Sequence, residues 1–391
     1  MSSWKEYKLG DIVSSNNKSI DKTYEFKNIQ YLDTGSLTNN KIDGFQEFKI
    51  SDAPSRAKRL VKHQDIVYST VRPIQRHFGF IENPQENLVV STGFSVIETN
   101  QKLAYPKFIY YFLSSDETVE ILDVIAEAST SAYPSLKPSD IENLDISLPP
   151  LEEQKAIAEV LSSLDDKIDL LHRQNKTLEN LAQTLFRQWF IEEAKEEWEI
   201  GTLDDILSVK GGSTPSTANS DFWDGEISWT TPRDLSSNVG VYLFKTERKI
   251  TEEGLEKISS GLLPTGTILL SSRAPVGYLA ISDIPLAINQ GYIAILDNKD
   301  FSKYFIYLWL KENIDYIVSN ANGSTFLEIS KSVFKSLEVI KPPKEIRLKF
   351  DNKVIPMFEK IKINSKQIQT LENLRDTLLP KLLRGEVRVE K

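Results

Sequence analysis

Two long segments of the chain carry apolar residues at alternating spacings of four and three, which is typical of a coiled-coil seam. The first runs over residues 148–190, starts at Pro149-Pro150 and is free of proline and glycine until Gly201. The second follows Pro342-Pro343. Because one narrow apolar stripe needs a partner, we expect the two helices to pack on each other. The predicted seam residues are Ile157, Leu161, Leu164, Ile168, Leu171, Asn175 and Leu178 in the first helix, and Phe350, Val354, Met357, Ile361, Asn364, Ile368 and Leu371 in the second.

The sequence preceding each helix also repeats. A shift of 193 positions superimposes the two helices, with Pro150 on Pro343 and Ile157 on Phe350. Upstream anchors match as well: Trp4 with Trp198, Leu9 with Leu203, Asp65-Ile-Val-Tyr-Ser-Thr-Val-Arg-Pro with Thr267-Ile-Leu-Leu-Ser-Ser-Arg-Ala-Pro, Gly93 with Gly291, and Phe108-Ile-Tyr-Tyr-Phe with Phe305-Ile-Tyr-Leu-Trp. Between the anchors the copies differ, so we infer a duplicated scaffold that carries different insertions.

Short strand-like runs bounded by turn residues dominate the start of each copy, and helical segments follow. In the first copy we expect strands near residues 28–32, 65–71 and 87–92 and helices near 106–113 and 116–128. The predicted fold is α+β, with two tandem α/β domains, two long helices forming an antiparallel coiled coil, and a pseudo-twofold internal repeat. The predicted boundaries are 1–148 and 193–341 for the domains and 149–192 and 342–391 for the helices.

Two asparagines give the helix pair a register. Asn175 and Asn364 interrupt the stripes, and in an antiparallel arrangement that pairs them every neighbouring seam pair is apolar. Those pairs are Ile168 with Leu371, Leu171 with Ile368, Leu178 with Ile361, and Leu185 with Val354. Each asparagine then finds a hydrogen-bonding partner in a dry seam. In the alternative, each faces solvent where its stripe drifts, and Pro380 limits the register beyond Leu378.

Composition narrows the class of protein. The chain has 391 residues, no cysteine, three histidines and a net charge of −9. We therefore expect no disulfide, no thiolate chemistry and no structural metal site. No apolar run is long enough to span a membrane, and the N-terminus lacks a signal-peptide core, so we expect a cytoplasmic protein. A basic island at residues 56–76 stands out against the acidic average. It predicts a DNA-binding patch, although an ordinary solvated face has the same composition.

Motifs of catalysis do not stand out. The sequence has no dinucleotide-binding or phosphate-binding glycine loop, no Pro-Pro tetrapeptide of the amino-methyltransferase type and no recognisable triad. Glu153-Gln-Lys155 has the spacing of a nuclease pair, but it lies in a first helical turn, where acidic residues are expected anyway. We therefore predict a binding protein without catalytic residues.

Several segments resemble the specificity subunit of type I restriction–modification systems over essentially the whole chain. They are LPPLEEQKAIAEVLSSLDDKIDLL in the middle, LRDTLLPKLLRGEVRV at the end, Gly211-Gly-Ser-Thr-Pro-Ser-Thr, Phe222-Trp-Asp-Gly-Glu-Ile-Ser-Trp, Tyr68-Ser-Thr-Val-Arg-Pro and Ser91-Thr-Gly-Phe. The resemblance implies a non-catalytic subunit whose two target recognition domains each read half of a bipartite asymmetric site in double-stranded DNA. It implies two modification subunits as partners, restriction subunits where present, and helices that dock the modification subunits and set the spacer. It places S-adenosylmethionine and ATP/Mg on the partners and no cofactor on this chain.

Base readout needs donors and acceptors on elements that can enter a groove. In the first domain we expect Ser69, Thr70, Arg72, Arg76 and His77 at bases and Arg56, Lys58, Arg59 and Lys62 at phosphates. The second-domain candidates are Lys210, Thr214, Thr231, Arg233, Arg273 and Gln290, whose amide suits adenine. Turns and solvated surfaces favour the same residue types, so we expect roughly half to touch DNA. Repeated aromatics are predicted as core: Phe108, Tyr110, Phe112, Phe305, Tyr307 and Trp309.

Two other functions remain open from the sequence. One is a coiled-coil scaffold that joins proteins without reading DNA. The other is the specificity part of a self-sufficient restriction–methylation enzyme, against which the missing catalytic motifs argue.

Overall fold

The structure is a computed structural model, and it describes residues 4–129, 133–236, 238, 240–273, 275–296, 300–323 and 327–389. The chain divides into two compact units, each with its own core. Unit 1 contains Met1–Lys167 and Leu371–Lys391, and unit 2 contains Ile168–Thr370. Both long helices, α4 (Leu151–Arg187) and α11 (Lys344–Leu383), contribute to both units. Among the described residues, no helix has the length and apolarity needed to cross a membrane.

Unit 1 is built from two four-stranded sheets, two strand pairs and three helices besides the ends of the long ones. The strands are β1 Lys5–Lys8, β2 Val13–Ser15, β3 Asn28–Leu32, β4 Leu37–Thr38, β5 Lys41–Ile42, β6 Gln46–Lys49, β7 Ala57–Leu60, β8 Ile66–Ser69, β9 Phe78–Phe80, β10 Leu88–Ser91, β11 Phe94–Thr99 and β12 Asp145–Leu148. The helices are α1 Pro106–Ser114, α2 Asp116–Glu127 and α3 Pro138–Glu142. The strands and helices predicted for residues 28–128 are therefore confirmed, apart from small differences at their ends.

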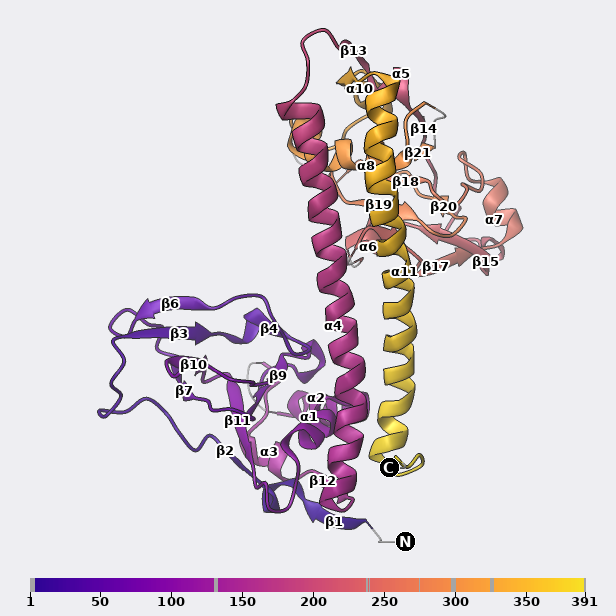
Figure 1. Cartoon of the computed structure of the whole chain (residues 1–391). Helices are drawn as coiled ribbons and strands as arrows, with labels where there is room; N and C mark the ends of the chain where they lie inside the picture. Colours follow the sequence, from indigo (N-terminus) through magenta and orange to yellow (C-terminus); the bar gives the residue numbers. More distant parts are fainter. Residues whose placement is uncertain are drawn as a thin grey trace. The chain divides into compact units, whose positions relative to one another are not determined.

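Unit 2 repeats this plan with more short helices. Its strands are β13 Glu199–Thr202, β14 Ser208–Lys210, β15 Trp223–Thr230, β16 Tyr242–Leu243, β17 Arg248–Ile250, β18 Ile268–Ser271, β19 Leu279–Ser282, β20 Ala287–Ile288, β21 Tyr292–Leu296 and β22 Glu338–Lys341. Its helices are α5 Leu203–Ile206, α6 Pro232–Ser236, α7 Glu252–Glu256, α8 Lys303–Glu312, α9 Ile314–Ser319 and α10 Lys331–Lys335. Figure 1 shows α7 beside the paired strands β15 and β17.

The sheets of the two units correspond strand by strand. The order β2-β11-β8-β9 in unit 1 matches β14-β21-β18-β19 in unit 2, where β16 adds a fifth strand. The order β6-β3-β10 matches β17-β15-β20, and in both the central contact, β3–β10 or β15–β20, is parallel. An antiparallel pair, β1–β12 or β13–β22, precedes each long helix. The insertions that share no sequence thus form sheets with the same order of three strands, to which β7 adds a fourth strand in unit 1.

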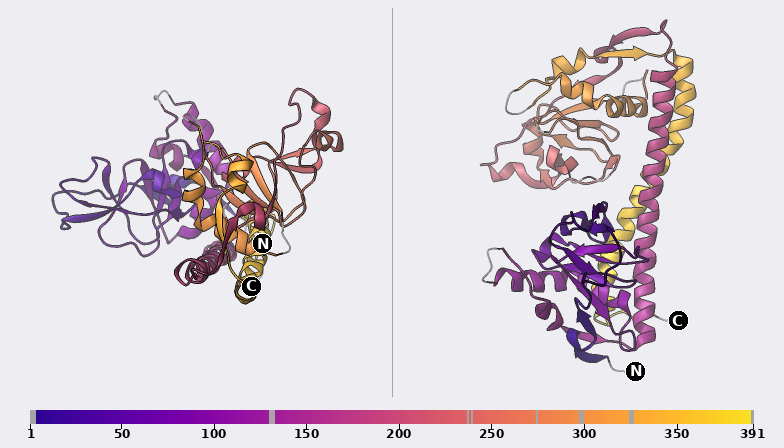
Figure 2. Two further views of the ribbon diagram at one scale, coloured as in Figure 1. Left: turned by 90° about the horizontal axis from the view of Figure 1, so that it is seen from above. Right: turned by 90° about the vertical axis from the view of Figure 1, so that its left-hand side faces the viewer.

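The two long helices pack antiparallel, as predicted (Figures 1 and 2). Within unit 2, Asn364 Nδ2 donates to Asn175 Oδ1 at 3.0 Å, and Asn175 Nδ2 donates to Ser365 Oγ at 3.1 Å. Asn364 is fully buried, whereas Asn175 is half-buried. The pairing of the two asparagines is therefore present in the structure, and it fixes the local register of the helices.

The helix stripes also belong to the cores of the units. Ile157 and Leu161 of α4 pack into the core of unit 1 with α1 and α2, and Phe350 and Phe358 of α11 pack into the core of unit 2 with α8. The stripes therefore also contribute to the cores of the units, which the sequence did not predict. Beyond the predicted seam, α4 adds Ala182 and Phe186 to the unit 2 core, and the π-helical turn Gln188–Glu192 that follows it adds Phe190. Four of the apolar residues predicted for the seam are only half-buried: Leu164, Leu178, Met357 and Leu371.

Hydrogen bonds and ion pairs join each globular part to its helix segments. In unit 1, Asp165 of α4 accepts from the Tyr111 hydroxyl at 2.7 Å and pairs with Arg375 of α11 at 3.0 Å. In unit 2, Lys362 and Lys366 of α11 pair with the Asp283 carboxylate, whose side chain is only 6% exposed. Charged groups held this way fix orientation more than they add stability. The predicted core aromatics are buried, except Phe112, which is half-buried.

Candidate nucleic-acid interface

The turn after β8 is held by two other segments of unit 1. Thr70 N donates to Gly93 O at 2.9 Å, and the Thr70 hydroxyl donates to the same carbonyl at 3.0 Å. Thr70 O accepts from Leu136 N at 2.7 Å. Because segments distant in sequence hold this turn, the side chains that follow it start from a rigid base.

Two arginines flank the short 3₁₀ turn Pro73–Gln75 that comes next. Arg72 and Arg76 have φ of 47° and 58°, in the left-handed region that non-glycine residues seldom adopt. Such backbone costs about 1–3 kcal/mol and persists only where the surroundings enforce it, often at binding sites. The Arg72 guanidinium is exposed and lies 6.0 Å from the centre of the exposed Tyr133 ring. This cation beside an aromatic face has the chemistry to meet a phosphate or a base.

The basic island divides into free and paired cations. Arg56 and Lys58, at β7, are exposed and have no ion pair within the described part of the chain. Lys62 pairs with Glu98, and Arg76 pairs with a carboxylate of α2 at 2.6 Å. A paired cation must give up its partner before it can bind a phosphate, so the exposed pair is better placed for that contact.

Three other first-domain candidates serve the interior of unit 1. Ser69 is buried, and its hydroxyl donates to Val71 O at 3.1 Å. The Nδ1 atom of His77 lies 2.6 Å from Leu37 O. Arg59 is half-buried, and burial lowers the pKa of its guanidinium. Ser69 and His77 thus have partners within unit 1, and Arg59 has a buried Nε atom without a hydrogen-bond partner among the described residues, so these three side chains are less available to DNA than Arg56 and Lys58.

The turn after β18 in unit 2 has the same construction. Ser272 N donates to Gly291 O at 2.8 Å, and Ser272 O accepts from Ile329 N at 2.9 Å. The next residue, Arg273, pairs with Glu328 at 3.4 Å. The two turns therefore occupy equivalent places in the repeat, with the same backbone contacts and different side chains.

Three of the second-domain candidates come together at this turn. The Thr214 hydroxyl donates to Gln290 Oε1 at 2.7 Å, and Arg273 Nη2 donates to Gln290 O at 3.0 Å. Gln290 is exposed, and its amide keeps two N–H donors and one acceptor position for a base. The loop before Thr214 approaches closely because Gly212 has no Cβ: an added Cβ would lie 1.9 Å from Ile288 O.

The remaining second-domain candidates have other partners. Lys210 Nζ donates to a backbone carbonyl at 3.2 Å. The Thr231 hydroxyl donates to the buried Asp234 carboxylate at 3.3 Å, and the exposed Arg233 pairs with Glu247 at 3.6 Å. Among the described second-domain candidates, hydrogen bonds connect Thr214, Arg273 and Gln290 to one another, so these three form the better defined group.

Sequence reasoning missed Arg248 at the start of β17. Its guanidinium lies 3.6 Å from the centre of the Trp223 ring and 5.7 Å from that of Trp229. Arg248 is exposed and has no ion pair among the residues the structure describes, so stacking on tryptophan holds its hydrogen-bond donors toward solvent. The pairing of β15 with β17 brings these residues together, and no local sequence pattern predicts that pairing.

A family described as the type I restriction modification DNA specificity domain matches residues 1–180 and 195–373. The chain belongs to this family of specificity subunits. The specificity subunit of the HindI enzyme from Haemophilus influenzae is 30% identical over 465 residues, covering 99% of this chain and 100% of that one. The MjaIX specificity subunit from Methanocaldococcus jannaschii is 31% identical over 334 residues, covering 80% and 76%.

A solved structure agrees on the fold. The S subunit from M. genitalium matches with a TM-score of 0.59 at 16% identity, covering 97% of this specificity subunit and 96% of that chain. A type I specificity subunit provides DNA recognition and is itself non-catalytic, and its cofactors belong to partner subunits. Family membership therefore decides against both alternatives raised from the sequence, the scaffold without DNA readout and the self-sufficient enzyme.

Proposed function

We propose that each globular part of this specificity subunit reads one half of a bipartite, asymmetric target in double-stranded DNA. The recognition domains are residues 1–148 and 193–341. The observation that carries the proposal is the pair of equivalent turns, which have the same backbone contacts around Thr70 and Ser272 but different exposed side chains. The two halves of an asymmetric target have different base sequences, so two similar domains must present different side chains to read them.

The candidate contacts fall into two classes. Arg72 in the first domain and the group of Thr214, Arg273 and Gln290 in the second lie at the fixed turns and are assigned to base edges. Arg56 and Lys58 are exposed cations and are assigned to phosphates. A guanidinium or amide held in a fixed orientation can form hydrogen bonds that distinguish one base from another. A cation on a long, exposed side chain binds phosphates of any sequence.

The long helices, residues 149–192 and 342–391, act as the spacer. The predicted seam from Ile157 to Leu185 spans about 43 Å at 1.5 Å per residue, a little more than one turn of DNA. Two modification subunits bind this chain and supply adenine methylation from S-adenosylmethionine. Restriction subunits, where present, add ATP-driven translocation and cleavage.

Sequencing of methylated adenines in a host that expresses this chain with its modification subunit tests the assignment of domains. Replacing residues 1–148 by those of another specificity subunit should change one half of the methylated motif and leave the other half and the spacer unchanged. A motif that changes in both halves, or in neither, would contradict the proposal.

Single substitutions test the two classes of contact. Arg72→Ala should weaken methylation according to the base at one position, whereas Lys58→Ala should weaken binding at all sequences and reduce its dependence on salt. Inserting four residues within the seam should alter the spacer between the half-sites. An unchanged spacer would show that the helices do not set it.

A further inference from the structure

An exposed arginine of unit 2 is held against buried tryptophan. The guanidinium of Arg248 lies 3.6 Å from the centre of the Trp223 ring, which is van der Waals contact, and Trp223 is only 7% exposed. The Trp223 and Trp229 rings meet edge to face, with centres 5.0 Å apart. Their Nε1 atoms donate to Ser216 O at 3.1 Å and to Ser213 O at 3.4 Å. Because both rings are fixed in this way, they restrain the plane of the guanidinium that stacks on them.

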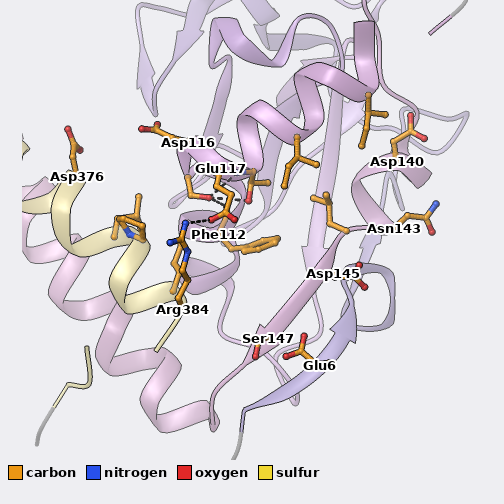
Figure 3. Close-up of a pocket in the computed structure, with 18 residues that line it drawn as sticks. Glu6, Phe112, Asp116, Glu117, Asp140, Asn143, Asp145, Ser147, Asp376 and Arg384 are labelled. Carbon is orange, nitrogen blue, oxygen red and sulfur yellow. Dashed lines mark hydrogen bonds and ion pairs between the residues drawn. The ribbon is translucent and has the colours of Figure 1, made fainter. Parts of the chain in front are cut away.

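The guanidinium of Arg248 has neither an ion pair nor a hydrogen bond among the residues that the structure describes. The nearby carboxylates of Glu226 and Glu247 pair with other cations, at 3.2 Å and 3.6 Å. An exposed arginine of unit 1 shows the more usual arrangement, since Arg384 pairs with Glu117 at 2.8 Å (Figure 3). The N–H donors of Arg248 are therefore available to a ligand that approaches from solvent.

Hydrogen bonds connect the tryptophans under Arg248 to the base-reading group described above. Ser213, whose carbonyl oxygen accepts from Trp229, directly precedes Thr214. The Thr214 hydroxyl in turn donates to Gln290 Oε1 at 2.7 Å. Arg248 and Gln290 therefore belong to one continuous part of unit 2, although they lie on different segments of the chain.

The first domain has a different side chain at the equivalent place. Arg248 lies opposite Trp229, the last residue but one of β15, and this residue also pairs with the parallel strand β20. In unit 1, Gln46 of β6 lies opposite Tyr31, the last residue but one of β3, which also pairs with the parallel strand β10. Gln46 Nε2 donates to Asp33 Oδ2 at 2.9 Å, so the side chain is already bound. The two domains thus differ at this position both in the side chain and in its availability.

The chemistry of Arg248 matches one base. The parallel N–H donors of a guanidinium fit the O6 and N7 acceptors that guanine presents in the major groove, and no other base has two acceptors there. β17 is the outermost strand of its described sheet and is antiparallel to β15, and a pair of antiparallel strands can enter a major groove (Figure 1). Any exposed lysine can neutralise a phosphate, whereas base readout depends on the fixed orientation that the tryptophans provide.

We propose that Arg248 is a specificity-determining residue that reads a guanine in the half-site of the second domain. Trp223 and Trp229 are positioning residues, which hold the guanidinium plane and do not themselves contact the base. This inference rests on the proposed function, in which the second domain reads one half of the target. Gln290 reads a different base pair of the same half-site.

Methylation by the complex of this chain with its cognate modification subunit tests the proposal, on the complete target and on targets with one base pair changed. The half-site of the second domain is the half that stays when residues 1–148 are exchanged. The unaltered complex should require a G·C pair at one position of this half. Arg248→Ala should lower the preference for that pair by about tenfold or more and leave the first half-site and the spacer unchanged. Arg248→Gln should shift the preference at the same position toward adenine.

Lys249→Ala is the matched control, because Lys249 is the next residue of β17, is exposed and points to the opposite face of the strand. This variant should keep the complete motif. Trp223→Leu keeps the charge of Arg248 but removes the stacking, so it should lower discrimination at the same base pair without changing the salt dependence of binding. Trp223→Phe retains an aromatic face and should restore most of the discrimination. Circular dichroism should show all variants folded.

Three results would overturn the inference. The first is a second-domain half-site that contains no G·C pair, and the second is a folded Arg248→Ala variant that keeps the complete motif. The third is an Arg248→Ala variant that binds all sequences equally less well and depends less on salt, because Arg248 would then contact a phosphate. In each case the proposed function stands if the unaltered complex methylates a bipartite motif. If the unaltered complex methylates no such motif, the proposed function fails and this inference fails with it.

Discussion

The asparagine pair between the long helices offers a direct test of how the seam is held. Asn364 is fully buried, its Nδ2 donates to Asn175 Oδ1 at 3.0 Å, and its Oδ1 has no hydrogen-bond partner among the described residues. Asn175→Ala removes the good acceptor and leaves only a long 3.4 Å contact from Asn364 to Gln174 Oε1. Asn364→Leu removes the whole buried amide.

The magnitudes follow from the cost of leaving buried groups unpaired. Asn175→Ala should destabilise the helix pair by about 1–3 kcal/mol, since a buried donor loses its partner. Asn364→Leu removes an unpartnered buried oxygen along with the bond to Asn175, so it should be neutral or stabilising by about 1 kcal/mol. In the double variant with leucine at both positions, we expect stability at least equal to that of the unaltered chain. The coupling between the sites should be about 0.5–3 kcal/mol.

Hydrogen exchange of peptides from α4 and α11 measures this destabilisation locally, so the result does not depend on how the two units of the chain unfold relative to each other. Asn180→Ala, at an exposed position of α4, is the control for the effect of alanine on the helix and should change stability by less than about 0.5 kcal/mol. If Asn175→Ala costs no more than Asn180→Ala, the buried pair does not contribute as the structure implies.

Three further changes probe the units separately. Burial raises the pKa of Asp65 from 3.8 to about 6, so the folded state binds its proton more tightly and stability should rise as pH falls from 7 toward 4. Asp65→Asn should flatten this pH dependence. In urea unfolding at pH 7.5, it should raise the free energy of unfolding by up to about 3 kcal/mol. Burial raises the pKa of Asp283, but hydrogen bonds and charge from Lys362 and Lys366 outweigh that effect and lower the pKa. The Asp283 carboxylate therefore stabilises the folded state above about pH 4, and this stabilisation is lost in acid. Asp283→Asn should cost unit 2 about 1–3 kcal/mol in thermal melts at neutral pH, and no cost would contradict the assigned ion pairs. Gly212→Ala places a Cβ 1.9 Å from Ile288 O and should destabilise unit 2 by about 3 kcal/mol, whereas Gly44→Ala, with open space around it, should be neutral in the same melts.

The long helices were the most predictable part of the fold. Their periodicity, helix starts and matching asparagines are local or repeat at a constant offset, so the antiparallel packing and the Asn175–Asn364 contact followed from the sequence. The sequence did not predict that these stripes also enter the globular cores. Phe358 and Phe186 show why, since they pack into a globular core that no seam spacing describes.

The sequence predicted which types of residue form the candidate site, but not which of these side chains are exposed and free to contact DNA. Arg56, Lys58, Lys62 and Arg76 look alike in the sequence, yet in the structure the first two are exposed without an ion pair among the described residues, and the last two are paired. Pairing depends on residues 36 to 40 positions away, which the spacing of a basic island cannot reveal. Arg248 was overlooked for the same reason, because two strands must pair before it meets Trp223.

The sequence by itself determined the duplication, the two long helices, their antiparallel direction and their register. These features follow from the spacing of apolar residues along each helix and from the constant offset between the two copies. Tertiary structure alone decided that the dissimilar insertions form sheets with the same order of three strands, with β3–β10 and β15–β20 parallel in both units. It also decided which cations of the basic island are paired with carboxylates and which have no ion pair among the described residues. The physical reason is that strand pairing, ion pairing and concave surfaces arise from contacts between distant segments, and their free energy depends on the assembled core and not on local pattern.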